Sequence, residues 1–166
     1  MSPSTGKPVL VHPFPAFVGE SPRALVLGSF PSVKSRETGF YYGHPQNRFW
    51  RVLAAVTGEE TPVSQDEKKR LLSKHGVALW DSIASCTVEG SSDSSIRNAV
   101  PNDIASLLRK TGISRVYCNG RKAYELYQKY VFPTTGLPAA LLPSTSPANA
   151  SWSLEMLTEA WRVIVS

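Results

Sequence analysis

The chain has 166 residues, 42% of them hydrophobic, which fits one compact domain with enough length to bury a core. Its formal net charge of +5 favours a polyanionic partner such as nucleic acid, although a basic soluble protein without such a partner would carry the same charge. The two cysteines, Cys86 and Cys118, form no CxxC motif, so they cannot by themselves assemble a zinc site or a four-thiolate iron–sulfur cluster.

The N-terminal sequence MSPSTGKPVLVHPFPAF is interrupted by prolines and carries one lysine, so it lacks the charged and apolar regions of a signal peptide. No segment approaches the run of about 18 apolar residues that a membrane-spanning helix needs. We therefore expect a soluble cytoplasmic protein, associated with the nucleoid if it is bacterial. We predict a single domain over residues 1–166, with residues 1–20 as an N-terminal extension packed on it.

The first half of the chain predicts two strands and two helices. The apolar run ALVLG at 24–28 ends in glycine and is typical of a strand buried on both faces of a parallel sheet. A long loop follows, after which Pro45 suits the first position of a helix. A capping box opens a second helix at Ser64, and Gly76 ends it just before a strand at 77–81.

The second half begins with a serine-rich segment, 82–100, whose lack of periodicity predicts an ordered loop. Beyond it the elements alternate again, with glycines and prolines at their ends. The predicted elements are a helix capped by Asn102 and ending at Gly112, a strand at 114–120, a helix at 121–130, a strand at 139–143, a loop at 144–151 and an amphipathic helix at 153–165.

This alternation of strands and helices predicts an α/β fold, a three-layer α/β/α sandwich around a four-stranded parallel sheet. In such sheets ligands bind at the carboxyl ends of the strands. The segments GSFPS, CNGRKAY and PSTSPAN each follow a predicted strand. We therefore expect them to converge on one edge of the sheet and form the site there.

Several kinds of site are excluded by the motifs of these segments. GSFPS contains neither GxGxxG nor GK[ST], so it lacks the glycines of a dinucleotide or P-loop site. No GxSxG nucleophile elbow occurs, and His44 is the one histidine in a candidate loop, where a solvated turn beside Pro45 explains it best. What remains is a combination of aromatic rings and amides, which suits an extruded nucleobase. Ordinary core packing of the rings is the alternative.

Two ordered segments, GSFPSVKSRETGFYYGHPQNRFW and LLPSTSPAN, resemble the two motifs of the uracil-DNA glycosylase superfamily. Their details, together with VALWDSIAS, SSDSSIRN and NGRKAY, are most similar to the hypoxanthine-DNA glycosylase branch, also called DNA-deoxyinosine glycosylases. The resemblance covers nearly the whole chain after residue 20. One position departs from the wider superfamily, because Phe30 stands where many members carry an Asp or Asn that positions or activates water.

The resemblance implies a monofunctional glycosylase that flips a deaminated base out of DNA and hydrolyses its N-glycosidic bond, without a metal or a cofactor. Asn47 matches the catalytic amide of the branch. Its simpler interpretation is a helix-start residue that satisfies backbone donors. The residues that match base-binding positions are Gly28, Ser29, Phe30, Ser32 and Tyr42. Those that match the loop contacting DNA are Ser144, Thr145, Ser146, Pro147 and Asn149, with Asn149 beside the space that the base vacates.

Further residues are weaker candidates. Asp81 ends a strand at the site edge and is an alternative base, although capping of the following turn explains it more simply. Ser92 and Ser95 could contact DNA phosphates. Five basic residues on strand-end loops or helix starts could contact phosphates, although a solvated charge explains each one alone more simply: Lys34, Arg36, Arg48, Arg121 and Lys122.

Three functions remain open from the sequence. The first is removal of hypoxanthine from DNA, the second is removal of uracil by the same chemistry, and the third is DNA binding without catalysis. DNA is the expected partner in each case. We expect the chain to act as a monomer.

Overall fold

The computed structural model describes residues 9–12, 14–30, 33–87 and 97–165. Its centre is a four-stranded parallel sheet in the order β3-β2-β6-β7, which confirms the predicted fold class. All five residues of β2 are buried, as expected for a central strand covered on both faces. The strands are β2 (Ala24–Gly28), β3 (Val77–Asp81), β6 (Arg115–Asn119) and β7 (Ala139–Leu142).

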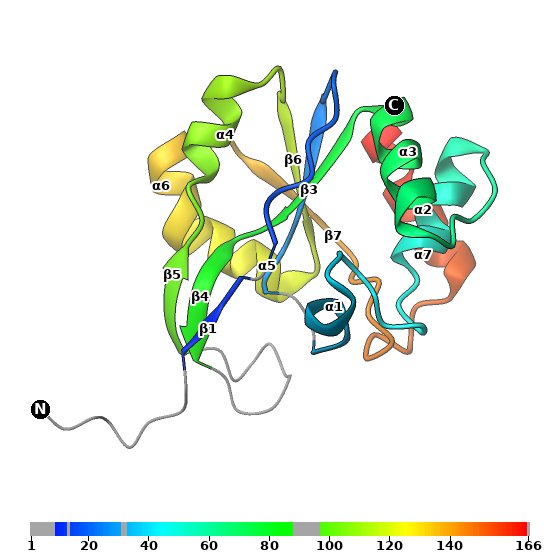
Figure 1. Ribbon diagram of the computed structural model, residues 1–166, viewed down its shortest axis with the longest axis horizontal. Helices are drawn as coiled ribbons and strands as arrows, with labels where there is room; N and C mark the ends of the chain where they lie inside the picture. The colour runs from blue at the N-terminus through cyan, green and yellow to red at the C-terminus, as the bar shows by residue number, and fades with distance from the viewer. Residues whose placement is uncertain (1–8, 13, 31–32, 88–96, 166) are drawn as a thin grey trace, which may run out of the picture.

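Helices cover both faces of this sheet, which gives the three layers visible in Figure 1. One face carries α2 (Phe49–Thr57), α3 (Gln65–His75) and α7 (Leu154–Trp161). The other carries α4 (Ile104–Lys110), α5 (Arg121–Leu126) and α6 (Phe132–Thr135), with a π-helical turn at Tyr127–Val131 before α6.

The central strand contributes to both hydrophobic cores because successive side chains of a strand point to opposite faces. Val26 packs in the core beneath α2 and α7, where Phe49 and Trp161 are fully buried. Leu25 and Leu27 pack in the core on the other face. The sheet is therefore held on both sides, and its carboxyl edge is fixed in place for the loops that follow.

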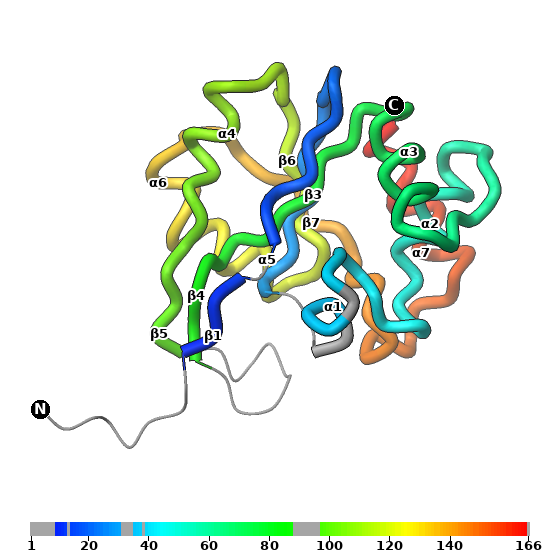
Figure 2. Tube along the Cα trace, in the orientation of Figure 1, coloured from blue at the N-terminus to red at the C-terminus, as the bar shows by residue number. Residues whose placement is uncertain are grey.

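A second sheet, which the sequence did not predict, lies beside the first (Figure 2). Its three antiparallel strands are ordered β1-β4-β5, with bounds β1 (Leu10–Val11), β4 (Ile83–Thr87) and β5 (Arg97–Pro101). The prediction of a loop over 82–100 was therefore wrong for the described parts of that segment. The strands form by pairing with residues distant in sequence, β1 in particular, and such pairing leaves little trace in local periodicity. Ser92 and Ser95 lie outside the described residues.

The ends of two helices can be compared with the ends that their capping residues predict. Helix α3 has the predicted capping box of Ser64 and Glu67 and ends at Gly76 with φ +69°. Helix α2, in contrast, begins at Phe49 and not at Pro45. Residues 44–47 instead form a turn in which the N–H of Asn47 donates to the carbonyl of His44. A short helix, α1 (Val33–Thr38), lies within the segment predicted as a loop. Within the described ranges, no helix is long and apolar enough to cross a bilayer.

Candidate active site

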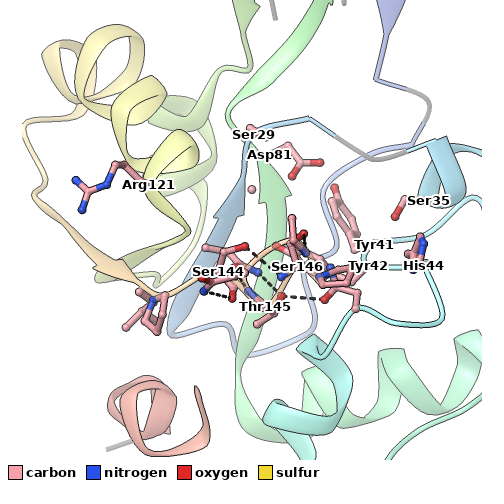
Figure 3. A pocket seen from close by; sticks show the side chains of 18 of the residues that line it. Ser29, Ser35, Tyr41, Tyr42, His44, Asp81, Arg121, Ser144, Thr145 and Ser146 are labelled. Atoms are coloured by element: carbon pink, nitrogen blue, oxygen red, sulfur yellow. Dashed lines mark hydrogen bonds between the residues drawn. The ribbon is translucent and has the colours of Figure 1, made fainter. Parts of the chain in front are cut away.

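The carboxyl ends of the parallel strands surround a pocket of about 1010 Å³, the position that the fold class predicted. The loops after β2 and β7 both line it, as do the ends of β3 and β6. Of the residues matched to the two motifs, those that line the pocket are Gly28, Ser29, Phe30, Tyr42, Asn47, Ser144, Thr145, Ser146, Pro147 and Asn149. Ser32 lies outside the described residues. Figure 3 shows Ser144, Thr145 and Ser146 gathered in one part of the pocket.

The side chain of Asn47 is held by its oxygen. Oδ1 accepts the backbone N–H of Phe49 at 2.9 Å and the hydroxyl of Thr145 at 2.8 Å. Since both groups donate to this end of the amide, the orientation of the side chain is fixed. Among the described residues Nδ2 has no hydrogen-bond partner. Asn47 therefore presents a pair of N–H donors at a pocket-lining position.

Thr145 connects Asn47 to the end of β6. Its hydroxyl accepts from Nδ2 of Asn119 at 3.0 Å, and its backbone N–H donates to Oδ1 of the same asparagine at 3.0 Å. Thr145 is fully buried, so these bonds are protected from water. The catalytic candidate is thus fixed to both loops and to the sheet. Asn119 was not among the predicted site residues, although its place at the end of a predicted strand was a usable signal.

Arg48 holds the loop that follows β7, called the second loop, in place. Its guanidinium donates to the carbonyls of Ser146 (2.9 Å), Asn149 (3.0 Å) and Trp152, and its backbone N–H donates to the carbonyl of Thr145. These bonds give Arg48 a structural role in holding the loop, and its expected contact with phosphate stays a prediction. Its positive charge lies within the loop expected to approach DNA.

The other basic candidates are placed differently. Arg121 lines the pocket and remains a candidate phosphate contact. Arg36 lies with its guanidinium carbon 5.6 Å from the ring centroid of Phe30. The side chain of Lys34 lies outside the described residues.

The aromatic residues divide into pocket and core. Tyr42 lines the pocket and stacks on Phe49, with ring centroids 4.3 Å apart and planes 24° apart. Its φ of +54° is unusual for a residue other than glycine and turns the chain sharply at the rim. Phe30 also lines the pocket while packing against Ile83. Phe40 is a core residue and not part of the site, so the alternative interpretation holds for that ring.

Asp81 occupies the floor of the site beside Gly28, its register partner in the sheet. Its carboxylate does not cap the next turn, because the N–H groups of Ser82 and Ile83 donate to the carbonyls of Gly28 and Ser29. Instead Oδ2 lies 2.8 Å from Nε2 of His12. This histidine is separated from Asp81 by 69 residues, and no local sequence signal joins the two.

Gly28 is required by this arrangement. A Cβ atom at that position would lie 2.3 Å from Oδ1 of Asp81 and 3.4 Å from the hydroxyl of Tyr42. The absence of a side chain therefore lets the carboxylate lie directly over the end of β2.

The pKa of Tyr41 is raised, mainly by burial and also by the nearby negative charge of Asp81. The hydroxyl of Tyr41 donates to the carbonyl of Pro15. Tyr41 is consequently a neutral wall of the site.

Comparisons with known proteins identify the family to which the chain is similar. Residues 15–165 match the family model described as the uracil DNA glycosylase superfamily. A protein of Methanosarcina acetivorans named hypoxanthine DNA glycosylase is 37% identical over 153 residues, which are 91% of this chain and 95% of the relative. A protein of the same name from Methanosarcina barkeri is 31% identical, covering 89% and 93%. The solution structure of a putative uracil DNA glycosylase from M. acetivorans is similar, with a TM-score of 0.76, 33% identity and coverage of 91% and 96%.

Proposed function

The chain belongs to the uracil DNA glycosylase superfamily, and we propose that it is a monofunctional DNA glycosylase that removes hypoxanthine from DNA. The reaction is hydrolysis of the bond between C1′ of deoxyribose and the base nitrogen, after the deaminated nucleotide has been flipped into the pocket. The names of the two archaeal relatives support hypoxanthine as the first substrate to test. We also propose that the enzyme acts as a monomer.

The observation that carries this proposal is the fixed amide of Asn47, whose Nδ2 lies at the pocket without a partner among the described residues. Cleavage of the glycosidic bond leaves negative charge on the departing base. A preorganised donor stabilises that charge in the transition state without having to reorient. An amide has no useful acid–base chemistry near neutral pH, so Asn47 acts as a donor and not as a general base.

The rest of the pocket fits the same chemistry. Phe30 takes the position at which many superfamily members carry a water-activating residue, and a phenyl ring cannot activate water. Catalysis therefore rests on stabilising the leaving base and on positioning water, which favours bases that leave easily. The ring of Tyr42 supplies an aromatic surface for the flipped base.

The test is base release from a duplex with a single deoxyinosine, beside a duplex with a single deoxyuridine, with enzyme in excess. Wild type should release hypoxanthine, and Asn47→Ala should abolish release. Gln46→Ala is the matched control, because Gln46 is an exposed neighbouring amide outside the pocket lining. Faster release of uracil would make uracil the main substrate, whereas no release from either duplex would refute the glycosylase activity.

A second variant, Asn47→Asp, separates the role of the donor from the role of the oxygen. The aspartate can still accept the N–H of Phe49 and the hydroxyl of Thr145, so the fold of the loop is retained. It replaces the two N–H donors with a negative oxygen that faces the leaving base. We expect this variant to fold and to be inactive. Activity equal to wild type would show that the oxygen, and not the donor, is the catalytic group.

A further inference from the structure

A histidine at the rim of the pocket has no part in the mechanism above. His44 lines the pocket and is half-buried, while the next two residues, Pro45 and Gln46, are exposed. Figure 3 shows His44 next to Tyr42, on the opposite side of the view from Arg121. The solvated turn that explained this histidine from the sequence is therefore only part of its setting.

The turn fixes both the ring of His44 and the position of its proton. The backbone N–H of Gln46 donates to Nδ1 of the ring at 3.0 Å, and the N–H of Asn47 donates to the carbonyl of His44 at 2.9 Å. One residue earlier, the N–H of Gly43 donates to the buried hydroxyl of Ser35 at 2.9 Å. Because a backbone N–H can only donate, Nδ1 must accept, and the neutral ring carries its proton on Nε2.

The second ring nitrogen distinguishes histidine from the other residues that would suit this turn. An asparagine or an aspartate also accepts the N–H of the residue two positions further on. Histidine adds an N–H on the far side of its ring. Nε2 of His44 has no hydrogen-bond partner in the part of the chain that the structure describes. His44 therefore presents a fixed, neutral donor at the rim of the pocket.

We propose that His44 is a DNA-binding residue, whose Nε2–H donates to a backbone phosphate beside the flipped nucleotide. This inference rests on the proposed function. Only the base enters the pocket of a base-flipping enzyme, so the phosphates on either side of it cross the rim. Phosphate oxygens are strong acceptors, and neutral side chains as well as cations bind them.

A neutral donor differs from a cation in its response to salt. A lysine or arginine at a phosphate displaces a counterion, and its removal lowers the slope of log K against log salt by about one. Protonation of His44 would place a second N–H against that of Gln46, so the observed turn contains the neutral ring. His44 should therefore add affinity for DNA and leave the salt slope unchanged.

The experiment measures binding to a duplex with a single deoxyinosine that carries a 2′-fluorine. The fluorine disfavours positive charge on the sugar and so prevents release of the base. The phosphates on the 5′ and 3′ sides of this nucleotide are replaced, one at a time, by an uncharged methylphosphonate. A methylphosphonate far from the site measures the general cost of losing one charge. We expect His44→Asn, which keeps the acceptor of the turn, to bind the unmodified duplex about 10-fold more weakly than wild type.

The decisive comparison is between the variant and the modified phosphate. If the two groups are in contact, a methylphosphonate at one flanking position should weaken binding by wild type about 10-fold relative to the distant one, and binding by His44→Asn by less than about 2-fold. His75→Asn is the matched control, because His75 pairs with Glu59 at 2.9 Å and does not line the pocket. It should respond to each methylphosphonate as wild type does.

The outcomes separate this inference from the proposed function. Equal sensitivity of wild type and His44→Asn at both flanking phosphates overturns the inference, and so does a salt slope that falls by about one in His44→Asn. Insensitivity of wild type at both positions overturns it without any variant, so a failure of His44→Asn to fold does not remove the test. Base release from an unfluorinated duplex is measured separately. Release without coupling to a phosphate leaves the glycosylase activity intact, whereas coupling without release removes that activity and retains the phosphate contact.

Discussion

Replacing Thr145 by valine should weaken both the fold and catalysis, because its buried hydroxyl joins three parts of the site. Valine has nearly the same shape and keeps the methyl packing. It removes the bond donated to Asn47 (2.8 Å) and the bond accepted from Asn119 (3.0 Å). Each bond is worth about 1 kcal/mol net, so we expect the free energy of unfolding to fall by about 2 kcal/mol.

The catalytic effect is separate from the loss of stability. Without Thr145 the amide of Asn47 keeps only its bond to Phe49, so it can rotate away from the base, and base release should slow by about 10-fold or more. Urea unfolding gives the first quantity, and base release under conditions where the variant stays folded gives the second. Thr145→Ser retains the hydroxyl and is the control. Wild-type release by Thr145→Val, or equal losses in valine and serine variants, would refute the reasoning.

Three further predictions follow from single contacts. Arg48→Lys should lower the free energy of unfolding by about 2 kcal/mol in urea titration and slow base release, because lysine cannot span the carbonyls of the loop after β7. Arg51→Lys, at an exposed position in the first turn of α2, is the control and should change stability by less than about 0.5 kcal/mol. Burial raises the pKa of the Cys118 thiol to about 12, and Cys86 is also buried, so a thiol reagent at neutral pH should label both cysteines only after denaturation. Hydrogen bonds from backbone N–H groups at the start of α3 lower the pKa of Glu67, so its contribution to stability is present above the unfolded pKa and is lost as pH falls through the folded one; urea unfolding between about pH 5 and pH 3 should show a shallower loss for Glu67→Gln than for wild type.

The parallel sheet was predictable because each of its strands is a short apolar run that a glycine, an aspartate or a proline ends. The run at 24–28 is short, continuously apolar and ended by glycine, which is typical of a strand covered on both faces, and all five of its residues are buried. The second sheet lacks such a signal. Strand β4 (IASCT) contains only one large apolar residue, and β1 has only two residues, so these strands exist through pairing and not through local preference.

The same distinction between local signals and distant pairing applies to the residues of the site. Motif residues that follow strands could be placed at the pocket, because the fold class fixes where the strands end. Contacts across long separations could not be placed. Arg48 was a candidate phosphate contact because it is a basic residue at a helix start, yet its partners lie about a hundred positions further along. The pairing of His12 with Asp81 likewise depends on a second sheet that no local pattern predicted.

The two interpretations of Asn47 are parts of one arrangement. Its oxygen accepts the N–H of Phe49, the first residue of α2, as a helix-start residue should. If that were its whole role, serine or aspartate would serve as well, since each supplies an oxygen in the same place. Asparagine differs from both by its two N–H donors. The bonds to its oxygen from Phe49 and Thr145 fix those donors at the pocket, where the base departs as an anion. The backbone contact therefore orients the catalytic group, and the identity of the residue follows from the donor that the leaving base requires.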